Sequence, residues 1–155
     1  GVENREQTLE NKANSVLPLI WVDVDMIYRV FINLIENAIK YTPMGGHIEV
    51  GAQTTDGMFV KFWVKDNGPG IPPQDRDRVF DKFTRLRGKN NNPSGIGIGL
   101  SFCKLAVLGH GGQIWVESEL EKGTTFFLTL PVAQKKATGQ LKRQTGRLTI
   151  KEDKP

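Results

Sequence analysis

Four short motifs follow one another along the chain and constrain its fold more than any other feature. They are NLIENAIKY (33–41), DNGPGI (66–71), FDKF (80–83) and GIGIGL (95–100). Each motif alone is weak evidence. Together they supply an amide that suits a metal ion, a cation that suits phosphate, a carboxylate in a tight turn and a glycine-rich segment before a helix. The set predicts a nucleotide pocket assembled from segments that are distant in the sequence.

The size and composition are those of one globular domain. The chain has 155 residues, of which 38% are hydrophobic and 25% charged, and this suffices for a core without disulfides. Apolar runs stay far below the roughly 18 residues that span a bilayer, and no signal peptide opens the chain. We therefore expect no membrane contact by this domain. The chain begins with Gly1 and not with Met, which is compatible with a fragment of a longer protein.

The basic character of the chain is confined to its C-terminus. Residues 134–155 hold seven of the 21 Lys and Arg but only two of the 17 Asp and Glu, which leaves a net charge of −1 for the rest. We expect a domain at 1–133, followed by a basic, flexible tail at 134–155. Nucleic acid is not an expected partner, and a nucleic-acid binder remains an alternative that rests on the tail alone.

The periodicity of apolar residues predicts an α/β (α+β) two-layer sandwich, with one sheet covered on one face by about three helices. A helix capped by Asp23 or Asp25 should run to Tyr41. The other expected elements are an edge strand within 5–13, strands at 17–22, 47–53, 58–65, 113–118 and 124–130, and helices at 74–83 and from the glycine motif to 108.

The first motif places four polar residues on one stripe of a helix: Asn33, Asn37, Lys40 and Tyr41. The amide oxygen of Asn37 suits Mg²⁺, a hard cation that takes few protein ligands and keeps water and phosphate oxygens. Lys40 can meet phosphate as a point charge, and Tyr41 can lie against a base or sugar. The alternative is the solvated face of an ordinary amphipathic helix.

Asp66 ends an expected strand and enters a turn through Gly68 and Gly70. A carboxylate held there can accept a hydrogen bond from the exocyclic amino group of adenine, which guanine lacks at that edge. The two glycines let a base approach the backbone. The alternative is a plain Asp-led turn between two elements.

Gly95, Gly97 and Gly99 precede a helix whose free N–H groups and dipole favour a bound phosphate. Their spacing is neither that of a dinucleotide-binding motif nor that of a P-loop. The preceding loop carries cations that could reach a terminal phosphate, namely Arg85, Arg87 and Lys89. The alternative is a loop with ordinary solvated charges.

The cysteine, the two histidines and the phenylalanines of the FDKF motif are not expected to take part in catalysis. Cys103 is the only cysteine, so one chain has no disulfide framework and no cysteine-based zinc site. Phe80 and Phe83 are expected to pack in the core. His47 and His110 are isolated in the sequence and should be structural or exposed, so we predict neither a metal cluster nor a Ser/His/Asp site.

In this order and spacing the motifs resemble the N, first glycine, F and second glycine boxes of sensor histidine kinases, over about residues 17–131. The resemblance implies the catalytic ATP-binding domain and its Bergerat fold, a mixed, mostly antiparallel sheet that gyrase, Hsp90 and MutL share. It implies ATP and Mg²⁺ as cofactors. It also implies a helical dimerisation and phosphoacceptor domain and a cognate response regulator as partners, and a cytoplasmic location, whether or not the parent protein is membrane-anchored.

The resemblance assigns roles to single residues. Asn37 would bind Mg²⁺, Lys40 would contact phosphate and Asp66 would select adenine. Other nucleotide-binding positions that it implies are Tyr41, Gly68, Gly70, Ile71, Gly95, Gly97, Gly99 and Leu100. Thr125 would support the Asp66 end of the site through water. Arg85 would contact the γ-phosphate, with Lys82 as a second candidate for that contact.

Asn33, Asn37, Lys40 and Arg85 are the catalytic positions that the resemblance implies. Related ATPases place Glu at the position of Asn33 to activate water, and an amide cannot act as that base. Phosphoryl transfer to a protein side chain is therefore favoured over hydrolysis. Catalysis would rest on positioning and charge neutralisation.

The sequence departs from the family pattern at two points. Ile96 stands where such kinases usually carry Thr or Ser, and no His is followed by an acid and an Arg/Thr/Pro run. We therefore expect a domain that binds ATP but lacks its own phosphoacceptor. Two alternatives stay open: a degenerate, non-catalytic nucleotide-binding module, and a serine kinase of the anti-sigma type.

Overall fold

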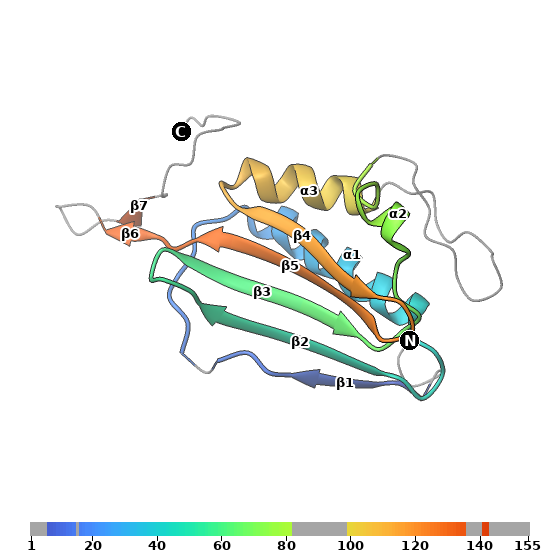
Figure 1. The fold of residues 1–155 in the computed structure, drawn as a ribbon. Coiled ribbons are helices and arrows are strands. Elements are labelled where there is room, and N and C mark those ends of the chain that lie inside the picture. The colour runs from blue at the N-terminus through green and yellow to red at the C-terminus, as the bar shows by residue number, and fades with distance from the viewer. Residues whose placement is uncertain (1–5, 15, 82–98, 136–140, 143–155) are drawn as a thin grey trace.

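In the computed structural model of the chain, residues 6–14, 16–81, 99–135 and 141–142 are described. The main elements are β1 (Thr8–Asn11), α1 (Val24–Tyr41), β2 (His47–Thr54), β3 (Phe59–Asp66), α2 (Pro73–Arg76), α3 (Gly99–Gly109), β4 (Gln113–Glu119) and β5 (Gly123–Pro131). The five strands form one sheet in the order β1-β2-β3-β5-β4 (Figure 1). β1 is parallel to β2, and the other neighbours are antiparallel.

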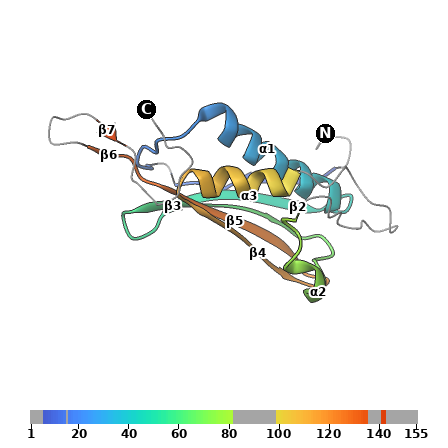
Figure 2. The same cartoon turned by 90° about the horizontal axis from the view of Figure 1, so that it is seen from above.

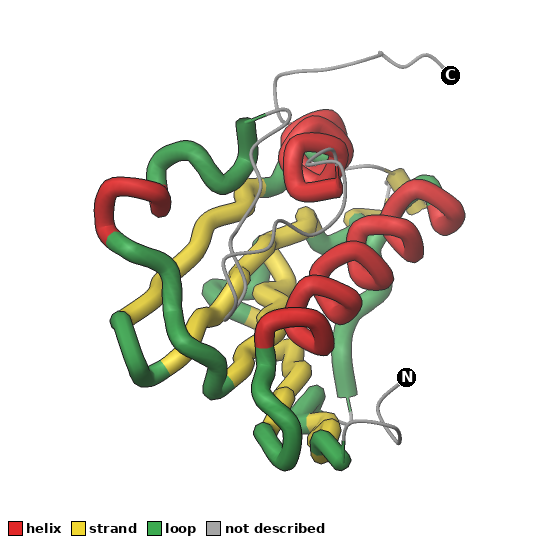
Figure 3. The backbone as a smooth tube through the Cα atoms, turned by 90° about the vertical axis from the view of Figure 1, so that its right-hand side faces the viewer, coloured by secondary structure: helices red, strands yellow, loops and turns green. Residues whose placement is uncertain are grey.

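Figure 2 shows that α1 and α3 lie on the same face of this sheet, and Figure 3 shows the two helices as neighbours beside the strands. The predicted two-layer sandwich with a mixed, mostly antiparallel sheet is confirmed. Apolar side chains of β2, β3 and β5 alternate toward the helices and form the core with them. Cys103 of α3 is fully buried there, and burial raises the pKa of its thiol to about 12, as expected for an inert cysteine.

α1 forms because its start is capped and its apolar residues keep helical spacing. The carboxylate of Asp23 accepts a hydrogen bond from the N–H of Met26 (3.0 Å), which selects Asp23 over Asp25 as the cap. The residues that α1 buries are Ile27, Val30, Leu34 and Ala38. The helix ends at Tyr41, just before Thr42-Pro43, where proline disfavours a further turn.

Replacing Asp23 with alanine should lower the free energy of unfolding by about 1 kcal/mol, because the first turn of α1 loses its side-chain acceptor. Asp23→Asn keeps an acceptor at this position and should lose well under half as much. Urea denaturation followed by circular dichroism compares the three proteins. An equal loss in both variants would show that the charge of Asp23, and not its hydrogen bond, stabilises the helix.

Two predicted elements are wrong in kind or extent. Residues 17–22 form no strand: Ile20 alone makes an isolated bridge to Val132, and Leu19 and Trp21 are 67% and 50% exposed. Pro18 lacks the N–H that a paired strand needs there. Over the described residues 74–81, the helix predicted at 74–83 is reduced to the single turn α2.

Packing fixes the segment that follows α2. Val79 is 1% exposed, and the ring of Phe80 packs edge-on against Phe126 with centroids 6.0 Å apart. The N–H groups of Arg78 and Asp81 bond to carbonyls three residues back, at 3.1 and 3.0 Å. Tight turns therefore replace the predicted helix, and the predicted packing of Phe80 is confirmed. Phe83 lies outside the described residues.

Beyond β5, a short β6 (Gln134–Lys135) pairs antiparallel with β7 (Leu141–Lys142). This pairing was not predicted, and the division of the chain at residue 133 stays a prediction. Within the described ranges, every helix is too short or too polar to cross a membrane.

Candidate nucleotide-binding site

Three segments meet at the end of the sheet where β3 stops, on the right of Figure 1. They are the C-terminal end of α1, the loop 67–72 after β3, and the turn from β4 to β5. The N–H of Glu121 in that turn donates to the carbonyl of Pro69 (2.7 Å), which ties the turn to the loop. The loop of the second motif is therefore held against the β4–β5 turn.

Asp66 is the buried carboxylate of this region. It is 7% exposed, and its Oδ1 accepts a hydrogen bond from the N–H of Gly68 (2.8 Å). Burial raises the pKa of Asp66, and backbone hydrogen bonds from Gly68 and Thr124 oppose this shift. The Asp-led turn that the sequence left open is therefore present. A turn at the surface does not require a buried carboxylate. A carboxylate that accepts a hydrogen bond from a ligand amino group binds it more strongly when it is shielded from water and held in place.

The two glycines of the loop allow close packing against the protein itself. A Cβ added to Gly68 would lie 2.6 Å from the carbonyl oxygen of Tyr41, so the loop rests on the last turn of α1. Gly70 has a φ of +82°, and a Cβ there would collide with the carbonyl of Glu119. Glycine at these positions brings α1 and β4 against the loop, a role that the sequence did not reveal.

The polar stripe of α1 faces this region and the start of α3. The amide of Asn33 donates to the carbonyl of Gly99 (3.4 Å), so Asn33 holds the beginning of α3. Asn37, one turn on, is half-buried, and no described residue makes a hydrogen bond with its side-chain amide. Lys40 is exposed and Tyr41 half-buried. A half-buried amide oxygen that can accept a ligand has the donor chemistry that Mg²⁺ requires.

Part of the predicted site can be located and part cannot. Leu100 is 8% exposed and belongs to the core, while Gly99 begins α3. Ile71 is 5% exposed and belongs to the hydrophobic core next to the Asp66 loop. The other predicted positions, Lys82, Arg85, Gly95 and Gly97, lie outside the described residues, as does Ile96.

The strand register corrects one prediction. Asp66 pairs with Thr124, whereas Thr125 pairs with Lys65. Thr124 is 7% exposed and, as the alternation along β5 requires, lies on the helix-covered face with Phe126, while Thr125 points to the opposite face. The threonine beside Asp66 is therefore Thr124.

Ser118 is a site residue that sequence reasoning missed. Its hydroxyl accepts the N–H of Ile71 (2.7 Å), donates to the carbonyl of Gly123 (3.0 Å) and lies 2.9 Å from the hydroxyl of Thr124. It thereby connects the Asp66 loop to β4 and β5. No local pattern marks this serine, because the residue that links it to the Asp66 loop, Ile71, is distant in the sequence.

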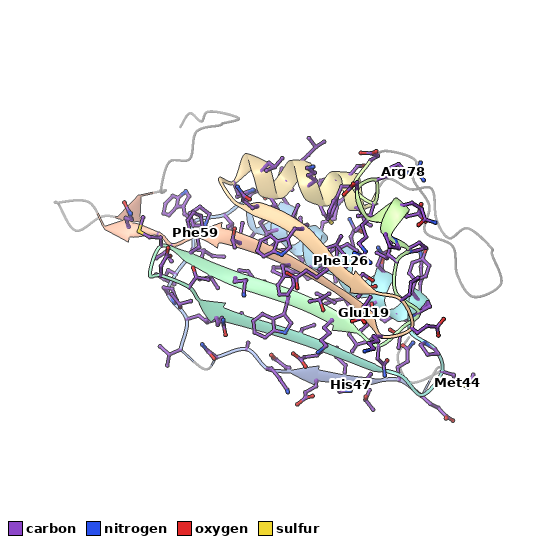
Figure 4. The ribbon with its side chains drawn as sticks, viewed as in Figure 1. Met44, His47, Phe59, Arg78, Glu119 and Phe126 are labelled. Atoms are coloured by element: carbon purple, nitrogen blue, oxygen red, sulfur yellow. The ribbon has the colours of Figure 1, made fainter. Side chains whose placement is uncertain are left out.

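The histidines have separate structural surroundings. His110 accepts the N–H of Asp23 at Nε2 (3.0 Å) and contacts the carbonyl of Ala106 through Nδ1 (2.7 Å), so its predicted structural role is confirmed. His47 lies at the start of β2, near Met44 (Figure 4).

Pairing of β1 with β2 brings ligand atoms of Glu10, His47 and Glu49 within 4.8 Å of one another, a grouping that the sequence analysis did not predict. His47 Nε2 lies 3.1 Å from a Glu10 oxygen. The ammonium group of Lys12 lies 3.9 Å from Glu10 and 3.8 Å from Glu49. Because these groups already pair with one another, we assign no metal to them.

The helix-covered sheet, with a buried carboxylate in a loop that packs against the end of α1, defines a class of protein: an α+β sandwich with a candidate ligand site at the end of β3. Residues 22–134 match the family model described as histidine kinase-, DNA gyrase B- and HSP90-like ATPase. The chain belongs to this family. Membership in a family of ATPases supports ATP as the nucleotide of the site.

Individual relatives agree with this assignment. The adaptive-response sensory kinase SasA of Synechococcus sp. (strain JA-2-3B'a(2-13)) is 47% identical over 116 residues, which are 75% of this chain and 30% of that kinase. The chain thus spans about a third of the length of this relative. The structure of the mycobacterial sensor histidine kinase MprB has a TM-score of 0.74 and 30% identity, over 84% of this chain and 88% of that one.

A third similar structure is the histidine kinase ThkA in complex with the response regulator protein TrrA. It has a TM-score of 0.69 and 27% identity, over 84% of this chain and 36% of that one.

Proposed function

We propose that this chain is the ATP-binding catalytic domain of a two-component sensor histidine kinase. It binds ATP with Mg²⁺ and donates the γ-phosphate to a histidine on a helical dimerisation and phosphoacceptor domain. A cognate response regulator then receives the phosphate. The observation that carries the proposal is the buried, fixed carboxylate of Asp66, packed through Gly68 against the end of the helix that bears Asn37.

The residues around Asp66 would recognise the base. The carboxylate accepts the adenine amino group, while Thr124 and Ser118 hold the strand and loop that position it. Ile71 supplies an apolar surface for the base. This arrangement favours adenine over guanine, because guanine presents a carbonyl oxygen to a carboxylate.

Residues of α1 would bind the phosphates. Asn37 would hold Mg²⁺, which supplies charge neutralisation on the phosphate oxygens when bound. Lys40, exposed on the same stripe, would contact phosphate as a point charge. Arg85 and the glycines at 95 and 97 are proposed to contribute as the resemblance implies.

Asn33 favours transfer over hydrolysis. An amide has no basic group with which to take a proton from water, and the Asn33 side chain already donates to the carbonyl of Gly99. The chain's own contribution is therefore to hold ATP and neutralise its charge, while the nucleophile comes from another domain.

The proposed partners follow from the relatives. ThkA forms a complex with a response regulator, and SasA extends well beyond the part that this chain matches. We place the domain in the cytoplasm.

Phosphotransfer to a supplied acceptor tests this function. The full chain, mixed with labelled ATP, Mg²⁺ and the phosphoacceptor domain of the parent kinase, should label the acceptor, and Asp66→Ala should not. The label should be lost in acid and retained in alkali, as for phosphohistidine. An acid-stable, alkali-labile label would indicate the serine kinase instead. ATP binding without transfer would indicate a non-catalytic module.

A further inference from the structure

Gln7 is a buried polar residue that lies outside every motif. It comes just before β1 and is 6% exposed. Its side-chain amide Nε2 donates two hydrogen bonds to the C-terminal end of α1, to the carbonyl of Thr42 (2.7 Å) and to the carbonyl of Ile39 (3.0 Å). A residue more than thirty positions upstream thus binds the end of the helix that carries the proposed phosphate contacts.

Carbonyl groups in the last turn of a helix have no partner within the helix. The last helical hydrogen bond of α1 joins the N–H of Thr42 to the carbonyl of Ala38. The next carbonyl, that of Ile39, accepts its hydrogen bond from Gln7 instead. Lys40 and Tyr41 lie between the two carbonyls that Gln7 holds. One amide therefore fixes the backbone on both sides of these two residues.

The orientation of the Gln7 amide is determined by its surroundings. A reversed amide would place its oxygen against two carbonyl oxygens, which repel it. In the observed orientation neither Gln7 Oε1 nor Thr42 Oγ1 has a hydrogen-bond partner among the described residues, although both atoms are buried. Such atoms are costly to bury. A hydrocarbon side chain would avoid the cost, so the contribution of Gln7 lies in its two donated bonds.

The effect of these bonds reaches the adenine side of the site. The carbonyl of Tyr41 is the group against which Gly68 packs. The N–H of Thr8, next to Gln7, donates to the carbonyl of Gly46 (3.0 Å), and the N–H of His47 donates to the side-chain oxygen of Asn67 (2.8 Å). The start of β1 is thus connected to the end of α1 and to the loop that follows Asp66.

We infer that Gln7 is a positioning residue of the nucleotide site, which acts through the carbonyls of Ile39 and Thr42 on the placement of Lys40 and Tyr41. The inference rests on the proposed function, because it assumes that these residues contact ATP. It predicts that the hydrogen bonds from Gln7 to the end of α1 contribute to the affinity for ATP.

Gln7→Met tests this inference, because it keeps the length of the side chain and removes both donors. Titration calorimetry of the full chain with Mg-ATP, at a temperature where every variant is folded, should show about tenfold weaker binding, as expected for the loss of about one net hydrogen bond. Gln53→Met makes the same chemical change at an exposed position of β2 and should leave affinity unchanged. Val60→Ala, in the core at the other end of β3, should lower the melting temperature without changing affinity.

The outcomes separate the inference from the proposed function. If the unmodified chain binds no ATP, both fall. If it binds ATP and Gln7→Met binds equally well, Gln7 is only structural and the inference is wrong. Affinity that falls in Val60→Ala as much as in Gln7→Met would overturn it too.

A measurement without substitution covers the case in which Gln7→Met does not fold. Coupling is reciprocal, so bound Mg-ATP should shift the side-chain amide resonances of Gln7 in an ¹⁵N-labelled chain and slow their exchange. The amide of Gln53 should not respond. Unchanged Gln7 resonances at saturating ATP would contradict the inference.

Discussion

Asp66→Ala should weaken ATP binding at least about 100-fold, the largest loss of affinity that we expect from one substitution. The adenine amino group loses a charged acceptor, and the buried backbone N–H groups of Gly68 and Thr124 lose theirs. Calorimetric titration of the full chain with Mg-ATP measures the loss. The unmodified chain should bind GTP no better than the variant binds ATP.

Asp66→Asn provides a control for folding. Because burial raises the pKa of Asp66 above the ordinary value of 3.8, ionised Asp66 opposes folding at neutral pH, and this cost disappears only when the pH falls below 3.8. A neutral amide avoids the cost, so Asp66→Asn should melt no lower than the unmodified protein at pH 7. It should still bind ATP poorly, since its amide can present a donor to the adenine amino group. Normal ATP binding by Asp66→Asn would show that the negative charge of Asp66 is not required to bind adenine.

Much of the fold could be predicted because its signals are local. The helical spacing of Ile27, Val30 and Leu34, with Asp23 before them, specifies α1. Strands were predicted at 47–53 and 58–65, and Gly57 in the turn between them has a φ of +84°, which glycine adopts readily. In such segments, residues that are close together in the sequence determine the secondary structure.

Some of the site was predictable for the same reason, and the rest was not. Asp66 and Asn37 stand in recognisable motifs, whose chemistry can be inferred from residue type and spacing. The prediction of Thr125 where the structure has Thr124 beside Asp66 could not be avoided in this way. A shift of one residue moves a side chain to the other face of a sheet, and only the pairing of β3 with β5 fixes the register. Ser118 contacts the Asp66 loop through Ile71, and Gln7 contacts the end of α1 through Thr42; both partners are distant in the sequence, so no local pattern identifies these residues.

The wrong secondary-structure predictions have the same origin. The apolar residues at 17–22 suggested a buried strand, but Leu19 and Trp21 are largely exposed. After α2, the burial of Val79 and the contact of Phe80 with Phe126 determine the backbone path. In both segments tertiary contacts override the local pattern.

Gly123→Ala is expected to cause the largest loss of stability, about 3 kcal/mol or more. Gly123 has a φ of +127°, which L-residues rarely adopt, and a Cβ there would collide with the backbone carbonyl of Asp66 and lie 3.0 Å from the Cα of Asn67. Neither the backbone at Gly123 nor the neighbouring strand β3 can move without a large energetic cost. The β3–β5 pairing must therefore open next to Asp66. Urea denaturation should therefore show reduced stability, and calorimetry should show weakened ATP binding.

Gly57→Ala separates the two causes. Gly57 also has a positive φ, of +84°, but a Cβ there has no atom within 4 Å, so this variant carries backbone strain without a collision. It should cost about 1 kcal/mol and leave ATP binding unchanged, since the turn lies at the opposite end of β3 from Asp66. Similar losses in both variants would mean that strain alone explains the effect. A larger loss at Gly123, joined to weaker ATP binding, would show that contact between the β4–β5 turn and Asp66 supports both the fold and the adenine acceptor.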